Sequence, residues 1–194
     1  MTRIFAIPVL LALSSCGVLR PVNDSPTNHL LQPLVAERSI TGISPSVAVA
    51  RPSLPGYLER EQIVSRTTDG SIVMNQNQLW AEPLDSGIAR IVAMNLGRLE
   101  NSLNILPVQS FVGMEYDQLL EIRISRFETD PSGDLVLECT WKLQPVHGPM
   151  TSPRAFQTRI SKGGPFAPRG NQSARVLAMS QAISELSKNI AQSL

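Results

Sequence analysis

The sequence predicts a single α/β domain in which helices pack on a sheet. Three observations favour this class. Short β-prone runs bounded by proline or glycine fill the first part of the chain, and two long alternating runs are joined by a turn at residues 130–133. Two amphipathic helical patterns lie at residues 84–101 and 173–192, one before and one after the long runs. We expect the apolar stripes of these helices to face the sheet, and find neither an internal repeat nor a second domain.

An export signal is predicted at the N-terminus. Arg3 supplies a short positive region, and residues 4–13 form an apolar segment that is too short to span a bilayer, which needs about 20 residues. Leu13-Ser14-Ser15-Cys16 then resembles the bacterial lipobox. We therefore expect cleavage after residue 15 and lipidation of Cys16. Two or more acyl chains on this cysteine would give stable anchoring to a membrane. The alternative is an ordinary signal peptide with an incidental cysteine.

Gly17 follows the lipidated cysteine. In the lipoproteins that this signal resembles, Asp at that position retains the protein at the inner membrane, so Gly17 indicates a periplasmic protein anchored to the outer membrane. Residues 17–28 are polar and contain prolines, which is typical of a tether, and such a segment reaches about 20 Å on average. The expected organisation is a signal peptide at 1–15, the lipidated cysteine and tether at 16–28, and the α/β domain at 29–194.

The elements of the domain follow in order. Strands are expected at residues 29–32, 46–51, 63–67, 71–75, 105–106, 115–128, 135–144 and 156–160, the last at an edge. Asp69-Gly70 is typical of a two-residue type I′ hairpin turn. Pro83 suits the first turn of a helix, with Glu82 and Asp85 near its positive end. Its apolar stripe comprises Leu84, Ile88, Ile91, Val92, Leu96, Leu99 and Leu103.

Composition and motifs give little support for catalysis. The net charge is +1 with mixed signs, so nucleic acid is not an expected partner. Lipidation of Cys16 leaves Cys139 alone, where a small buried hydrophobe is favoured over a reactive thiol or a disulfide with a partner. His29 lies beside the tether and His147 in a loop, so both are expected to be solvated. Without a metal, phosphate or nucleophile motif, we expect no cofactor, no metal and no enzyme activity.

Residues 54–66 contain the candidate partner interface. Tyr57, Arg60 and Arg66 are amphipathic side chains of the kinds favoured at interface hot spots. The alternative is structural, with a turn at Pro55-Gly56 and the following side chains filling the core. For Leu58 the core is favoured, whereas the sequence does not decide for the three candidates. Trp80, just before a helix, is expected to staple its start to the core.

The same region carries a family resemblance. Residues 52–66 (PSLPGYLEREQIVSR) and 79–84 (LWAEPL) resemble the signature of the PqiC family, auxiliary lipoproteins of ABC-type and MCE-type lipid transport systems. Further agreement lies at residues 90–96, 127–128, 137–141 and 182–186. Glu59 stands where the family often has Asp.

The resemblance implies a fold and a role. The fold would be similar to the N-terminal domain of TolB, with helices on a mixed, roughly five-stranded sheet. The role would be docking in lipid transport between the membranes, with an inner-membrane permease and a periplasmic MCE-domain protein as partners, and a homo-oligomer left open. The alternative function is a stand-alone periplasmic lipid-binding lipoprotein. An envelope hydrolase is the third hypothesis, which the lack of a partnered nucleophile argues against.

Overall fold

Two long antiparallel strands form the centre of the structure, a computed structural model that describes residues 25–36, 39–112, 115–161 and 172–194. β6 (Gln118–Thr129) and β7 (Leu135–Pro145) pair along almost their whole length. A bulge between Ile124 and Arg126 shifts their register. Since side chains alternate between the two faces of a strand, the bulge moves Arg126 and Glu128 to the face opposite Ile124.

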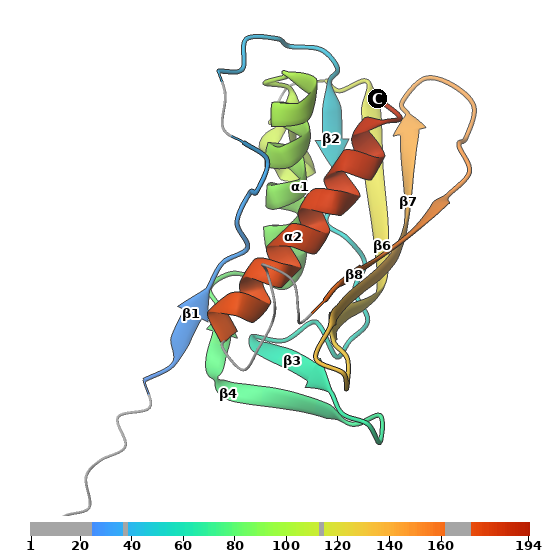
Figure 1. The fold of residues 1–194 in the computed structure, drawn as a ribbon. Coiled ribbons are helices and arrows are strands. Elements are labelled where there is room, and N and C mark those ends of the chain that lie inside the picture. Colours follow the sequence, from blue (N-terminus) through green and yellow to red (C-terminus); the bar gives the residue numbers. More distant parts are fainter. Residues whose placement is uncertain (1–24, 37–38, 113–114, 162–171) are drawn as a thin grey trace, which may run out of the picture.

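Six shorter strands complete a mixed sheet of eight strands (Figure 1). β8 (Arg154–Ile160) pairs with β7 and forms an edge. On the other side, β2 (Val47–Val49) pairs in parallel with the beginning of β6, and β3 (Gln62–Arg66) with its end. The outer strands are β4 (Ile72–Trp80) and β1 (Thr27–His29) beyond β3, and β5 (Ile105–Pro107) beyond β2.

The strand count corrects one expectation. The sheet of roughly five strands implied by the resemblance is wrong for the described residues, because the short runs at both of its ends also join the ladder. The first strand lies at Thr27–His29 rather than at 29–32, since these residues pair in parallel with Gln78–Trp80. Similarity to the TolB N-terminal domain stays a prediction.

The β3–β4 hairpin is confirmed, but its turn differs from the expected type. A type I′ turn needs positive φ at both central residues, whereas only Gly70 (φ 86°) has it here. The amide of Gly70 donates to the carbonyl of Thr67, and the amide of Thr67 donates to the carbonyl of Ser71. The loop is therefore a three-residue connection that ends in a left-handed glycine. Asp69 stabilises it by accepting a hydrogen bond from the amide of Ser71.

Both helices lie on one face of the sheet (Figure 1). α1 (Leu84–Glu100) is capped at its C-terminus by Asn101, which adopts the left-handed conformation (φ 54°). α2 (Gln172–Ala191) packs against α1. A short 3-10 helix, η1 (Val108–Ser110), follows β5. The expected helical stripes are buried except at Leu99, which is half-buried, and at Leu103, which lies beyond the end of α1 and is 54% exposed. The buried stripe of α2 comprises Val176, Met179, Ile183, Leu186 and Ile190.

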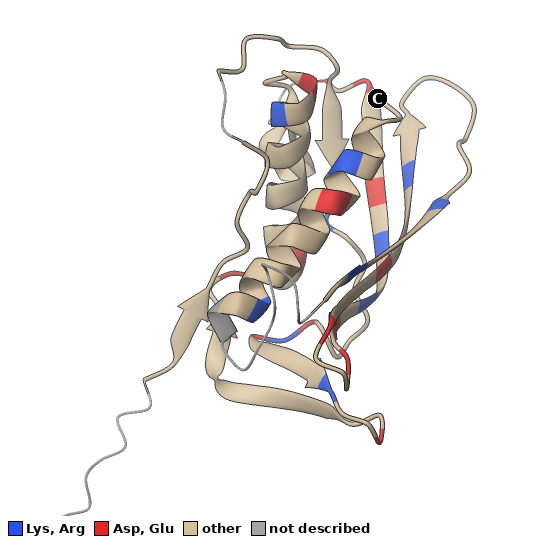
Figure 2. Cartoon of the chain, viewed as in Figure 1, with Lys and Arg blue, Asp and Glu red and all other residues tan. Residues whose placement is uncertain are grey.

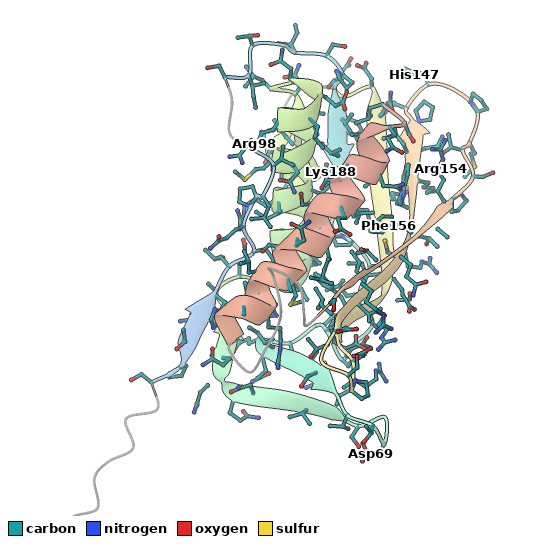
Figure 3. The ribbon with its side chains drawn as sticks, in the orientation of Figure 1. Asp69, Arg98, His147, Arg154, Phe156 and Lys188 are labelled. Atoms are coloured by element: carbon teal, nitrogen blue, oxygen red, sulfur yellow. The ribbon has the colours of Figure 1, made fainter. Side chains whose placement is uncertain are left out.

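Several single-residue expectations are resolved by burial. Leu58, Trp80 and Cys139 lie in the core, as predicted. Burial raises the pKa of the Cys139 thiol to about 12, which argues against a reactive thiol. His147 is exposed in the β7–β8 loop (Figure 3), whereas His29 is half-buried, with its Nε2 2.6 Å from Oε1 of Gln78. Among the described helices, none combines the length and apolarity needed to cross a membrane.

Candidate functional site

The loop between β2 and β3 separates the three predicted interface residues. Tyr57 in the loop and Arg66 at the end of β3 both hydrogen-bond to Glu128 of β6, on the sheet side of the loop. Arg60 lies on the other side of the loop, where it lines a surface cleft. Cys16 and Gly17 lie outside the described residues, so lipidation stays a prediction.

Glu128 is the centre of a buried polar cluster, the Glu128 cluster, formed with Tyr57, Arg66 and Arg126. The Glu128 side chain is fully buried, and both of its oxygens accept hydrogen bonds. Oε1 accepts from Nε of Arg66 and from Nε of Arg126, each at 2.9 Å. Oε2 accepts from the Tyr57 hydroxyl at 2.7 Å and from the amide of Phe127 at 3.0 Å. Four donors around two oxygens suit an ionised carboxylate, which can only accept.

The electrostatics of the Glu128 cluster favour a neutral Tyr57 and a charged Arg66. Burial, followed by the hydrogen bond to Glu128, raises the pKa of Tyr57 to about 12. The hydrogen bond to Glu128 raises the pKa of Arg66. Cζ of Arg66 also lies 5.8 Å from the centroid of the Tyr57 ring, within the range of a cation–π contact. The cluster therefore ties the β2–β3 loop to the sheet through a charge-assisted network.

Sequence reasoning did not assign a role to Glu128 or Arg126. Phe127-Glu128 was noted only as part of the family resemblance, and strict alternation would place Arg126 and Glu128 with the core-facing residues of β6. The bulge after Ile124 moves both side chains to the other face. The available signal was an acidic residue next to a phenylalanine at the end of an apolar strand. An acidic side chain that is buried there needs a partner.

The outer side of the loop borders a cleft of about 450 Å³, the motif cleft. Its lining residues come from the two stretches that carry the family resemblance and from the residue that follows them: Pro52, Leu54, Glu59, Arg60, Glu61, Trp80, Ala81, Glu82, Pro83, Leu84 and Asp85. A hydrogen bond from the amide of Trp80 to the carbonyl of Glu61, 2.6 Å long, joins the stretches directly. The indole of Trp80 and the side chain of Leu84 are almost fully buried, so they form an apolar floor.

The rim of the motif cleft is charged. Glu82 is held by Arg90, at 2.5 Å, and Asp85 lies 3.9 Å from Arg51. Glu59, Arg60 and Glu61 are exposed and form no ion pair with any residue that the structure describes. Gly87 leaves room for the Glu82 carboxylate, because a Cβ at that position would come within 3.1 Å of its Oε1. The charges at the start of α1 are thus paired, whereas those on the loop form no ion pair with a described residue.

The arrangement is suited to binding. Within the described ranges, no group of three His, Cys, Asp or Glu residues is placed to hold a metal ion. The motif cleft brings together an apolar floor and unpaired charges of both signs, which are the elements of a protein–protein contact. Its charged groups lack the partnered nucleophile or base that acyl-transfer chemistry would need.

The comparisons with known proteins give a family and a fold. A family model described as ABC-type transport auxiliary lipoprotein component matches residues 29–191. No protein of curated function matches the chain. A crystal structure of an uncharacterized protein is similar with a TM-score of 0.69 and 20% identity, over 87% of this chain and 98% of that one. Protein XCC0632 from Xanthomonas campestris is similar with a TM-score of 0.59 and 20% identity, over 86% and 90%. At this identity the two structures show the fold alone.

Proposed function

The chain belongs to the family of ABC-type transport auxiliary lipoprotein components, and we propose that it acts by docking a partner at the motif cleft. The transport system would move lipids between the inner and outer membranes. The partner would be its periplasmic MCE-domain protein, which connects to an inner-membrane permease. Lipidation of Cys16 would anchor the protein to the outer membrane, and the protein would position its partner without catalysing a reaction.

One observation carries this proposal. The two stretches of the family resemblance are separated by residues 67–78, and the pairing of β3 with β4 brings them together so that they line one cleft and are joined by a backbone hydrogen bond. The core explains the burial of Trp80 and Leu84, but it does not explain the exposed charges that have no partner among the described residues. A partner that pairs with Arg60 and its acidic neighbours would give these charges a role.

The three predicted interface residues then have different roles. Arg60 would contact the partner directly, since it is exposed at the rim of the motif cleft. Tyr57 and Arg66 would support the loop from behind, because their polar atoms are bound to Glu128. A double replacement of Tyr57 and Arg60 by alanine would mix the two effects, so the positions are tested separately.

Charge reversal at Arg60 tests docking. Arg60→Glu should reduce recovery of the MCE-domain partner from membranes solubilised in mild detergent, with an unchanged unfolding midpoint. Lys188→Glu makes the same charge change on the outer side of α2 (Figure 3) and should leave recovery unchanged. Equal recovery with wild type and both variants would count against the motif cleft. Failure to recover an MCE-domain protein with the wild type would count against the partner.

Replacement of the anchor tests localisation. Cys16→Ser should release the domain from the outer-membrane fraction without unfolding it, because the described core begins beyond the tether. Sedimentation of this variant with outer membranes would show that another attachment dominates. Native mass spectrometry of the detergent-purified protein should show no phospholipid that stays bound once the detergent is removed, because the docking role needs no lipid cavity. Co-purified phospholipid would favour the lipid-binding alternative, and the same spectrum would count the copies in any homo-oligomer.

A further inference from the structure

A partly buried cation at the start of α2 has no partner in the described part of the chain. Arg175 lies in the first turn of α2, its Nε is buried, and it makes no hydrogen bond there. Burial lowers the pKa of its guanidinium, although arginine stays protonated at neutral pH. Buried charges in folded proteins are normally paired, and an unpaired one is costly. The absence of a partner therefore suggests an external one.

Arg175 lines a shallow pocket of about 410 Å³ with the end of β3 and the β6–β7 turn. A second cation, Arg66, stands in the same pocket, with its Nε bound to Glu128. The walls are rich in hydroxyl groups. The Thr67 hydroxyl is directed to Asp69 and that of Ser132 to Asp130, whereas the side chains of Ser65, Thr68 and Thr129 hydrogen-bond to no other described residue.

The acidic residue of this pocket does not cancel its cations. Asp130 is bound by Arg159, and its other oxygen accepts hydrogen bonds from Ser132 at 2.6 Å and 2.9 Å. Arg159 also contacts Asp134 at 3.3 Å. Arg159 on β8 thus offsets part of the acidic charge, and Nε of Arg175 remains without a partner among the described residues (Figure 2 shows the charged residues that gather at this end of the sheet).

We propose that the pocket formed by Ser65, Arg66, Thr68, Thr129 and Arg175 binds a phosphate group, as a monoester or diester. Two guanidinium groups and three hydroxyls match the several acceptor oxygens of a phosphate, and arginine–phosphate hydrogen bonds are among the strongest in proteins. The site shares no lining residue with the motif cleft.

The same chemistry is offered by a phospholipid headgroup and by a soluble phosphate compound. The lining residues of the pocket come from the end of β3 and the β6–β7 turn. These elements lie at the lower end of the molecule in Figure 1, on the side of the hairpin tip that Asp69 marks in Figure 3. The described chain starts at this end, at Ser25. Because β1 begins toward this same lower end of the molecule in Figure 1, a headgroup is the source that we test first.

Calorimetric titration of the detergent-purified full chain tests the site. Inorganic phosphate should bind wild type and Lys188→Gln equally, and bind Arg175→Gln at least about tenfold more weakly, as expected for loss of a charge-assisted hydrogen bond. Water-soluble dihexanoyl phosphatidylglycerol separates the two sources. Tighter binding than inorganic phosphate identifies a headgroup site, and binding of inorganic phosphate alone identifies a soluble compound. No binding of either ligand overturns the proposal.

Thermal unfolding distinguishes a ligand site from a structural role. Without ligand, Arg175→Gln should unfold at the wild-type temperature or above it, because it removes an uncompensated charge. Phosphate should raise the midpoint of the wild type and leave that of Arg175→Gln unchanged, since only a folded state that binds the ligand is stabilised. A lower midpoint for Arg175→Gln, together with a wild type that does not respond to phosphate, would assign Arg175 a structural role.

Discussion

Replacing Glu128 by glutamine isolates the contribution of its charge to the fold. The side chain is fully buried and accepts four hydrogen bonds, two of them from guanidinium groups. In Glu128→Gln the shape is kept, but Arg66 and Arg126 lose the opposite charge. The amide nitrogen would also face a donor wherever it replaces an oxygen. Breaking a buried ion pair by changing one partner costs about 3–5 kcal/mol. This is a large part of the free energy of unfolding of a typical domain, which is roughly 5–15 kcal/mol.

Urea unfolding followed by circular dichroism measures this loss as a lower free energy of unfolding. In thermal unfolding, each kcal/mol corresponds to about 2–4 °C for a chain of this size, so Tm should fall by roughly 6–20 °C. Glu138→Gln is the matched control on the neighbouring strand. Its carboxylate is 37% exposed and 3.8 Å from Arg126, so its loss should cost at most about 1 kcal/mol. A Glu128→Gln protein within about 1 kcal/mol of wild type would refute the structural role of the Glu128 cluster.

Three further predictions concern single groups. Tyr57→Phe should cost about 1.5–3 kcal/mol at neutral pH, the range for a hydrogen bond to a charged group, and urea unfolding measures it. Because the folded-state pKa of Tyr57 is raised from 10.0 to about 12, the unfolding free energy of the wild type should decrease between these pH values, a loss that Tyr57→Phe should lack. Burial would raise the pKa of Asp130, but hydrogen bonds from Ser132 and Arg159 outweigh it and lower this pKa to about 2. The ionised Asp130 should therefore stabilise the fold above pH 3.8, and this contribution should be lost as the pH falls toward 2. Acid unfolding of the wild type and of Asp130→Asn measures the difference. Cys139 should resist maleimide in the native protein and react in urea, and rapid native labelling would contradict its burial.

Periodicity predicted the long elements, because each carries its own signal in the sequence. The stripe of α2 and the alternation of β6 and β7 are properties of one segment, and burial follows once helices pack on a sheet. The β3–β4 turn was predicted in place but not in type. Whether Asp69 takes positive φ depends on how the two strands pair, and that pairing is not local to the dipeptide.

The candidate site was harder to predict because its contacts are distant in the sequence. Arg66 and Glu128 are 62 residues apart, and they meet only because β3 pairs in parallel with the end of β6. The bulge after Ile124 is also needed to turn Glu128 toward the loop. Sequence therefore selected Tyr57, Arg60 and Arg66 as notable side chains, but could not separate the two that support the loop from the one at the cleft.

The short strand β3 connects both proposed binding surfaces. Its preceding loop forms one wall of the motif cleft, and its last residue, Arg66, binds Glu128 and lines the pocket of Arg175. A phosphate in that pocket would compete with Glu128 for the Arg66 guanidinium, and any shift of Arg66 would pass to Tyr57, which shares the same carboxylate. Coupling between binding sites is reciprocal, so a partner that fixes the loop would in turn alter phosphate affinity. Glu128 is thus placed where binding at one surface changes the affinity of the other surface for its ligand.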